Sequence, residues 1–372
     1  MESEKYPAEK GGALASVTVL VPCYNYGRFL RQCVDSVLSQ TGVDVRVLVV
    51  DDASTDDSAT IAAEIARIDP RVRLLRLPQN VGMIPAVNRG LREVASDYFV
   101  KLDADDLLTP GSLARSIALL ERHPHVGFVY GRPRHFTGSE PPSSAGLRRL
   151  TLRYVAEWLA IRGSAATTIW SGSDWMARRY RRAVNCISQP EAVIRCSVLH
   201  QVGEYNIALP HTSDLEMWLR IAAVSDVGRV NRVDQGFYRV HPDSMQRTVN
   251  AGVLNDFVGK RNAFLSALKY IGPSDGAGEL EGIVRRELAV QALEHGCDCF
   301  DKRPPDAALA AQLMEFAAMT FAQAKELALW RGAVQRQQRN ALSRWRLRAL
   351  VAAALRRFRD EVAFYRWIRT GA

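Results

Sequence analysis

The sequence predicts an α/β fold in which a mostly parallel central sheet is covered by helices on both faces and is followed by a helical C-terminal extension. Three observations support this prediction. Short β-branched runs alternate with segments of helical periodicity between residues 17 and 130, which is typical of parallel sheets with crossover helices. Polar clusters follow three of these apolar runs. From Val253 onward the pattern is helical.

The elements follow in order along the chain. Apolar runs that end in polar or glycine-containing loops predict buried strands. Five such strands are expected at residues 17–21, 45–50, 72–77, 98–102 and 126–130. Apolar residues at helical spacing predict helices over residues 29–38, 61–68, 87–91 and 111–121. Ser54 or Thr55 is expected to cap the second of these helices, because short hydroxyl side chains accept hydrogen bonds from its first amides.

The length of 372 residues, with 47% hydrophobic and 24% charged residues, suits one large core or two smaller ones. We expect a disordered leader over 1–14, a main domain over 15–250 and a helical region over 251–372. The main domain divides into a half at 15–131 and a half at 132–250. No apolar run reaches the roughly 18–20 residues that span a bilayer. Six scattered cysteines without a Cys-x-x-Cys pair predict a reducing, cytoplasmic environment.

The basic charge is confined to the C-terminus. The formal net charge is +9, and residues 331–372 hold eleven Arg against Asp360 and Glu361. The other 330 residues are balanced, with 38 basic and 38 acidic side chains, which argues against a nucleic-acid-binding face. Residues 343–369 mix Arg with aromatic and apolar residues. Such a helix suits an anionic membrane surface, or it packs on its own body or on a dimer partner.

A cluster of carboxylates follows the fourth expected strand. Asp103, Asp105 and Asp106 lie within four residues and repel each other, so they serve a purely structural role poorly. Hard oxygen ligands suit Mg²⁺ or Mn²⁺, which would hold a diphosphate. The alternative is a solvated turn that caps a helix.

Three further positions are candidates for chemistry. Asp52 ends the second expected strand, where a carboxylate could accept a hydrogen bond from a base or a ribose. Asp214 begins an amphipathic helix that contains Glu216 and Arg220, a pair expected at the surface. The dipole would keep Asp214 ionised as a general base, although a helix-capping role is open. His241 ends a strand-like stretch, either as a metal ligand or as a structural residue.

Five ordered motifs resemble the family-2 glycosyltransferases with the GT-A fold. They are Val17-Thr-Val-Leu-Val-Pro-Cys-Tyr-Asn25, Val49-Val-Asp-Asp-Ala-Ser-Thr-Asp56, Asn80-Val-Gly82, Leu102-Asp-Ala-Asp-Asp106 and Asp214-Leu-Glu-Met-Trp-Leu-Arg220. The resemblance covers roughly residues 15–245. It implies that the half at 15–131 binds a nucleotide sugar, with UDP as the favoured nucleotide, and that the half at 132–250 binds the acceptor.

The resemblance also implies roles for individual residues. Those expected around the nucleoside and the donor sugar are Pro22, Tyr24, Asn25, Asp52, Gly82, Asn88, Asp103 and Asp105. Those expected at the metal are Asp103, Asp105, Asp106 and His241. Asp214 matches the general base of a single displacement that inverts the anomeric carbon. The implied acceptor is a glycan or a lipid-linked sugar in cell-surface polysaccharide assembly, which would place the enzyme in the cytoplasm or on the inner face of the membrane.

Other interpretations are weaker. A non-catalytic nucleotide-sugar-binding module of the same fold is the main alternative, although the carboxylates at 103, 105 and 214 are all present. A dinucleotide-dependent dehydrogenase is disfavoured because no Gly-x-Gly-x-x-Gly follows the first strand. The segment Arg178–Arg182 either faces a pyrophosphate-bearing acceptor or forms a solvated loop.

Overall fold

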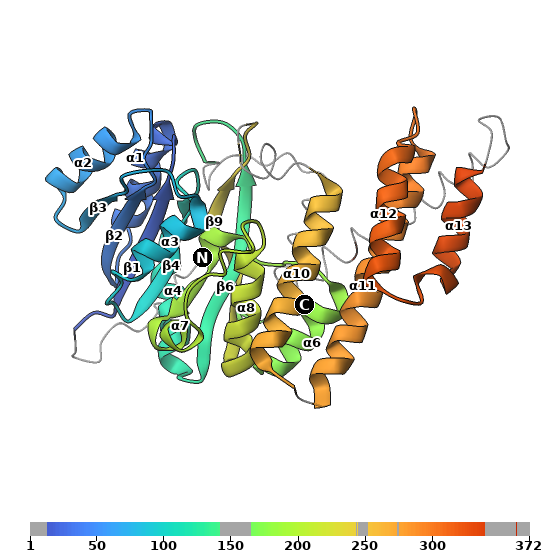
Figure 1. Ribbon diagram of the computed structural model, residues 1–372. Helices are drawn as coiled ribbons and strands as arrows, with labels where there is room; N and C mark the ends of the chain where they lie inside the picture. The colour runs from blue at the N-terminus through green and yellow to red at the C-terminus, as the bar shows by residue number, and fades with distance from the viewer. Residues whose placement is uncertain are drawn as a thin grey trace.

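The computed structural model describes residues 13–141, 165–242, 244, 252–273, 275–338 and 362 (Figure 1). Most of the expected leader (1–14) and of the expected amphipathic tail (343–369) lies outside the described residues. The described part is a central sheet flanked by helices, which confirms the predicted α/β class.

The sheet has nine strands in the order β3-β2-β1-β4-β8-β6-β9-β5, with β7 paired to β9. The strands are β1 (Ser16–Cys23), β2 (Asp44–Asp51), β3 (Val72–Arg76), β4 (Tyr98–Lys101), β5 (Leu107–Leu108), β6 (Val126–Phe136), β7 (Thr167–Trp170), β8 (Val193–Arg195) and β9 (Asp226–Arg239). The first four are parallel to one another, and β6 is parallel to β9. The three-residue strand β8 pairs antiparallel with both β4 and β6, so it joins the two parallel groups into one sheet.

The helices of the main domain are α1 (Gly27–Leu38), α2 (Ser58–Ile68), α3 (Met83–Leu91), α4 (Ser112–Arg122), α6 (Gly172–Arg182), α7 (Cys196–Val202) and α8 (Ser213–Val224), with the 3₁₀ turn η1 (Gln189–Glu191). They cover both faces of the sheet. Val17, Val19 and Val21 of β1 join one core cluster with residues of α1 and α4. Leu20 joins the other cluster with residues of α3 and α8. Successive side chains of a strand point to opposite faces of the sheet, so β1 contributes to both core clusters.

The C-terminal helices are α10 (Val253–Ile271), α11 (Asp275–Asp301), α12 (Ala307–Thr320) and α13 (Ala328–Gln337), with the 3₁₀ turn η2 (Ala324–Glu326). Helix α10 packs against α8, and α11 packs against both α10 and α6. In Figure 1 these helices lie beside the sheet, and α12 and α13 lie farthest from it. None of the described helices combines the length and the hydropathy that a membrane crossing needs.

Two local expectations need correction. Neither Ser54 nor Thr55 caps α2, because this helix begins at Ser58 with Asp57 as its N-cap residue and no side-chain cap. The Ser54 hydroxyl instead accepts the backbone N–H of Asn25 at 3.0 Å. The expected boundary between residues 131 and 132 falls inside β6, and both halves contribute strands to one sheet.

Candidate active site

Three polar clusters meet at one edge of the sheet. They follow the carboxyl ends of β1, β2 and β4, which are adjacent and parallel. In open α/β sheets, ligands bind in the crevice outside these strand ends. The arrangement of the strands therefore brings the predicted site residues from 22–25, 51–56 and 103–106 together.

The loop after β1 is built by Asn25, which adopts a left-handed backbone conformation with φ of 59°. Its side-chain oxygen accepts the backbone N–H groups of Thr55 at 2.8 Å and Asp56 at 3.3 Å. Asn25 therefore joins the loop after β1 to the loop after β2. Tyr24 beside it is 43% exposed, whereas Pro22 is partly buried. The tyrosine ring is therefore accessible to a ligand at this loop.

Asp52 holds the turn that follows β3. Its two carboxylate oxygens accept the backbone N–H groups of Val81 at 2.8 Å and Gly82 at 2.9 Å. Gly82 has a φ of 90°, and a Cβ placed there would meet only open space, so backbone conformation rather than crowding requires the glycine. Each carboxylate oxygen keeps a further lone pair, so contact of Asp52 with a base stays a prediction. Its neighbour Asp51 is buried and has one carboxylate oxygen without a partner.

Asn88 is bonded to the loop before α8. Its side chain donates to the Tyr205 carbonyl at 2.8 Å and accepts the Tyr205 backbone N–H at 3.0 Å, and the residue is 4% exposed. Asn88 therefore positions this loop, and its expected place near the donor sugar stays a prediction. The Tyr205 hydroxyl that it places is buried and has no hydrogen-bond partner.

The three carboxylates after β4 face different partners. Asp103 pairs with Lys101, which is itself buried at the end of β4. Asp105 lies 2.9 Å from the Nε2 atom of His241. Asp106 is buried, accepts the backbone N–H of Arg239 at 2.8 Å through Oδ1, and has no partner for Oδ2. The structure thus brings Asp105 and His241, two of the residues expected at the metal, together across 136 residues of sequence.

Arg239 fixes this cluster in place. Its guanidinium group donates to the carbonyl of Asp105 at 2.8 Å and also to Gln32 in α1. The aromatic rings of Phe29 and Phe136 lie 4.6 Å and 4.4 Å from its guanidinium carbon. The sequence analysis did not predict a role for Arg239, although the residue lies two positions before His241. The sequence pattern could not indicate this role, because Phe29 and Phe136 approach Arg239 only in the folded chain.

The electrostatics of the cluster suit a cation. Burial raises the pKa of Asp105, and the charge of Asp103 raises it further. Burial and then the charges of Asp105 and Asp103 raise the pKa of Asp106 well above its usual range. The Oδ2 atom of Asp106 and the Nδ1 atom of His241 are buried without partners. Among the described residues no three His, Cys, Asp or Glu side chains converge as a complete metal site. The residues fit a Mg²⁺ or Mn²⁺ ion that takes its remaining ligands from phosphate and water.

Asp214 lies near the same carboxylates from the other side of the site. It is in the first turn of α8, whose N-cap residue is Thr212, so Asp214 is not the cap. Asn185 donates to its Oδ2 atom at 2.6 Å. Burial raises the pKa of Asp214, while Lys101 and Asn185 counteract this shift and the charge of Asp103 adds to it. Asp214 thus lies within the electrostatic range of the Lys101–Asp103 pair.

The expected surface pair in α8 is buried. The side chains of Glu216 and Arg220 are 4% and 6% exposed and lie 2.9 Å apart. Arg220 also donates to the carbonyls of Val202 and Glu204, and Glu216 accepts from Ser266 of α10 at 3.2 Å. The pair therefore anchors α8 to its neighbours, because carbonyl and hydroxyl groups satisfy the charges inside the core.

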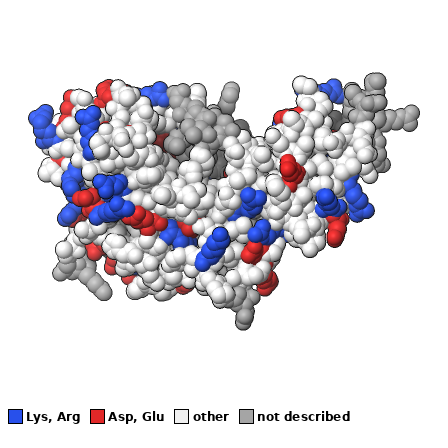
Figure 2. Space-filling model, viewed as in Figure 1, with Lys and Arg blue, Asp and Glu red and all other residues white. Residues whose placement is uncertain are grey.

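Two surface features lie outside the site. Figure 2 shows basic and acidic side chains interspersed over the visible face, without a basic stripe on the described atoms.

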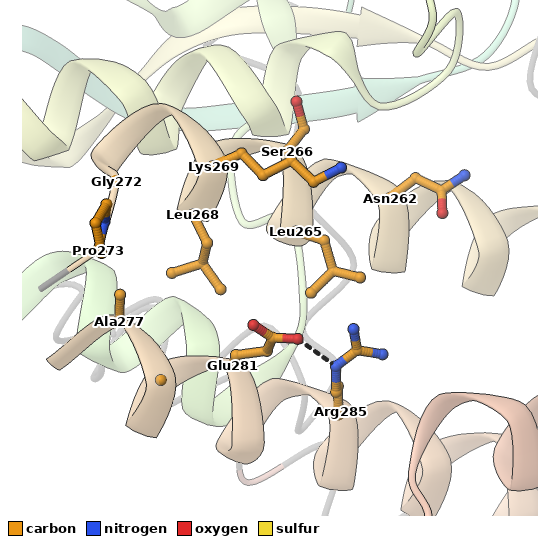
Figure 3. Close-up of a pocket in the computed structure, with 11 residues that line it drawn as sticks. Asn262, Leu265, Ser266, Leu268, Lys269, Gly272, Pro273, Ala277, Glu281 and Arg285 are labelled. Atoms are coloured by element: carbon orange, nitrogen blue, oxygen red, sulfur yellow. Dashed lines mark hydrogen bonds and ion pairs between the residues drawn. The ribbon is translucent and has the colours of Figure 1, made fainter. Parts of the chain in front are cut away.

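A groove between α10 and α11 is lined by Leu265, Leu268, Lys269, Glu281 and Arg285 among others, and Glu281 and Arg285 form an ion pair across one turn (Figure 3). The groove holds none of the predicted site residues, so we place the chemistry at the sheet edge.

Comparison with known proteins agrees with this placement. Residues 18–180 match the model of "Glycosyl transferase family 2". An uncharacterized glycosyltransferase of Haemophilus influenzae is 30% identical over 110 residues, or 30% of this chain and 34% of that protein. The chondroitin synthase of Pasteurella multocida is 35% identical over 119 residues, or 32% of this chain and 12% of that protein. The matched segments thus span about a third or less of these curated relatives.

Solved structures support the fold. Residues 1–349 of S. aureus TarS, crystallised with UDP-GlcNAc, match with a TM-score of 0.56 and 13% identity, covering 84% of this chain and 92% of that one. A second crystal structure of the same TarS segment matches with a TM-score of 0.53 and 14% identity, covering 84% of this chain and 91% of that one. At this level of identity the likeness concerns the fold, which is GT-A.

Proposed function

We propose that the chain, whose residues 18–180 match glycosyltransferase family 2, is an inverting, metal-dependent hexosyltransferase. It would transfer a sugar from a nucleotide-diphosphate donor to an acceptor hydroxyl. The observation that supports this proposal most is that Asp214, from α8, lies within the electrostatic range of the Lys101–Asp103 pair at the end of β4. The proposed reaction needs a proton acceptor close to the motif that binds the diphosphate.

The donor would lie along the edge formed by the loops after β1, β2 and β4. The exposed ring of Tyr24 offers a stacking surface for the base, and the turn at Gly82 leaves open space for the ribose and phosphates. We propose UDP as the nucleotide, and TarS, which shares the fold, was crystallised with UDP-GlcNAc. Asp105 and His241 would hold Mg²⁺ or Mn²⁺, with Asp103 and Asp106 beside them. The ion would neutralise charge on the leaving diphosphate.

The displacement itself needs one proton acceptor. Asp214 would take the proton from the acceptor hydroxyl while that oxygen attacks the anomeric carbon from the face opposite the diphosphate. The new glycosidic bond forms as the bond to the diphosphate oxygen breaks, so the configuration inverts and the nucleoside diphosphate leaves. Asn185 orients the carboxylate through its 2.6 Å hydrogen bond, which also favours the ionised form.

The acceptor and its location are further parts of the proposal. We propose a glycan or lipid-linked acceptor in cell-surface polysaccharide assembly, with the protein on the cytoplasmic side of the membrane. Residues 343–369 would supply contact with anionic lipid, and they lie outside the described part except for Val362.

Nucleotide release from a panel of UDP-, GDP- and dTDP-sugars tests the function and identifies the donor. Each donor is incubated with Mn²⁺, with Mg²⁺ or with EDTA, in the absence and presence of a lipid extract. We expect metal-dependent release from one donor, lost in Asp105→Ala. Binding of a donor without any turnover would favour the non-catalytic module of the same fold.

A further inference from the structure

One arginine of the basic segment in α6 is buried. Arg178 and Arg181 are exposed, but Arg179 is 1% exposed. All three of its guanidinium nitrogens lack hydrogen-bond partners. Its guanidinium carbon lies 5.5 Å from the centre of the Trp175 ring, a cation–π contact that satisfies none of the five N–H donors.

The stability of the fold does not explain this side chain. Arginine remains protonated in proteins, and a buried charge without a partner is strongly unfavourable. Replacement of buried charged groups by apolar groups of similar volume is often neutral or stabilising. A methionine on this face of α6 would serve the packing as well. The guanidinium group is therefore better explained by a partner that the described residues do not provide.

The surroundings of Arg179 are cationic. Arg229 of β9 is also 1% exposed. Burial raises the pKa values of both Cys186 and Tyr130, and the positive charges of Arg179 and Arg229 oppose the rise at each. The two guanidinium groups thus act on the same pair of side chains and repel each other.

The nearby acid does not balance these charges well. Burial raises the pKa of Glu191 well above its usual range, which favours the neutral carboxyl group. Its Oε2 atom also has no hydrogen-bond partner. An added anion would satisfy the guanidinium donors that Glu191 does not reach.

The chain connects Arg179 to the proposed general base. The Arg179 carbonyl accepts the backbone N–H of Ala183 at 2.8 Å, and Ala183 ends α6 with a φ of 48°. This left-handed residue turns the chain so that Asn185 reaches Asp214. The charge of Asp214 also contributes to the raised pKa of Glu191. Six residues of chain thus join Arg179 to the side chain that holds Asp214.

We propose that the side of the site formed by α6 and β9 holds a subsite for an anionic group of the acceptor, a phosphate or a carboxylate, which Arg179 binds through its planar guanidinium fork. The assignment to the acceptor rests on the proposed function, because α6 leads directly to Asn185, which binds the proposed general base Asp214. A planar fork pairs with two oxygens of one oxyanion, so an acceptor that bears such a group would be selected over a neutral one.

Anion binding tests the subsite without any enzymatic turnover. Inorganic phosphate and, separately, glucuronate are titrated at low ionic strength with EDTA, and thermal stability is followed. EDTA removes divalent metal, so that the diphosphate site contributes little. We compare wild type with Arg179→Met and with Arg178→Met, an exposed neighbour on the same helix. Arg179→Lys is the second variant, because it keeps the charge but loses the fork.

We expect wild type and Arg178→Met to bind phosphate or glucuronate equally well and Arg179→Met to bind at least about tenfold more weakly. Without the anion, Arg179→Met should be as stable as wild type or more stable. Arg179→Lys should show an intermediate loss. Equal binding by all variants, no saturable binding of either anion, or a marked loss of stability in Arg179→Met without the anion would overturn the proposal. A wild type that binds the anion through Arg179 but releases no nucleotide would contradict only the proposed function.

Discussion

The loops after the N-terminal strands and the segment from α6 to α8 use their polar side chains in different ways. In the loops, the exposed Asn25 and the buried Asp52 accept hydrogen bonds from backbone amides of neighbouring loops. In the segment from α6 to α8, Arg179, Tyr205 and Trp218 have buried donors that no described residue satisfies. The comparison teaches that motif residues on the donor side also build the loops, whereas the segment from α6 to α8 retains buried donors that a bound group could satisfy.

The largest effect should come from Asp214→Asn, which removes the proposed proton acceptor and retains the shape of the side chain. We expect sugar transfer to fall by roughly 10²–10⁴-fold, the usual contribution of a general base. Steady-state kinetics with the identified donor measures this. The matched control is Asp174→Asn in the first turn of α6, which should change little. Nearly full activity of Asp214→Asn would mean that Asp214 and the unpartnered buried donors near α8 do not serve sugar transfer.

The buried pair in α8 should dominate stability. Arg220→Ala leaves Glu216 buried without its cation, and we expect the free energy of unfolding to fall by about 3–5 kcal/mol. Urea denaturation followed by circular dichroism measures it. Arg92→Ala breaks the pair with Glu204, whose side chains are 57% and 41% exposed, and should have a far smaller effect because solvent screens it. Equal losses in both variants would contradict the anchoring role of Arg220.

The Tyr205 hydroxyl offers a sharper test of the comparison. Tyr205→Phe removes a buried hydroxyl without a partner, so we expect stability to rise by about 1 kcal/mol. Because the phenol lies in the electrostatic range of Asp214 and Asp103, the same change should reduce transfer about threefold to tenfold, the size of one hydrogen bond to the substrate. Thermal unfolding and kcat/KM together decide this. A variant with lower stability and unchanged activity would show that the hydroxyl has an internal role.

The smallest effect concerns pH. Asp214 acts only when deprotonated, so kcat/KM should rise with pH through its pKa, which burial raises above the ordinary value of an aspartate. Asn185→Ala removes a hydrogen bond that lowers this pKa, and the acidic limb of the profile should move to higher pH. The control Asn262→Ala on the exposed side of α10 should leave the profile in place. A shift to lower pH in Asn185→Ala would contradict the assignment of the acidic limb to Asp214.

The sequence predicted the strands well because buried parallel strands are short continuous apolar runs. Each of the five expected strands overlaps a strand of the sheet. The sequence could not predict β8, whose three residues pair with β4 and β6 in space. The burial of Glu216 and Arg220 was missed because an i,i+4 charge pair has the same spacing on a surface and in a core. The pairing of Asn88 with Tyr205 spans 117 residues, a distance that no local pattern covers.

The sequence placed Asp105 and His241 in one expected metal site only through the family resemblance, and their direct hydrogen bond was not predicted. Local sequence gives each residue a role but not a partner. Arg239, which holds the cluster through Asp105 and Gln32, shows the limit of that reasoning. Its position is set by three elements that come together only in the folded chain.

Calorimetric titration of the donor tests the central claim most directly, because it asks whether a nucleotide sugar binds at this edge of the sheet. UDP-, GDP- and dTDP-sugars are titrated into wild type, Asp105→Ala and Asp44→Ala, with Mn²⁺ and with EDTA. Asp44 lies at the opposite end of β2 and serves as the matched control. We predict that one donor binds wild type and Asp44→Ala with Mn²⁺, and binds at least about tenfold more weakly with EDTA or in Asp105→Ala. Failure of every donor to bind wild type in the presence of metal would contradict the account.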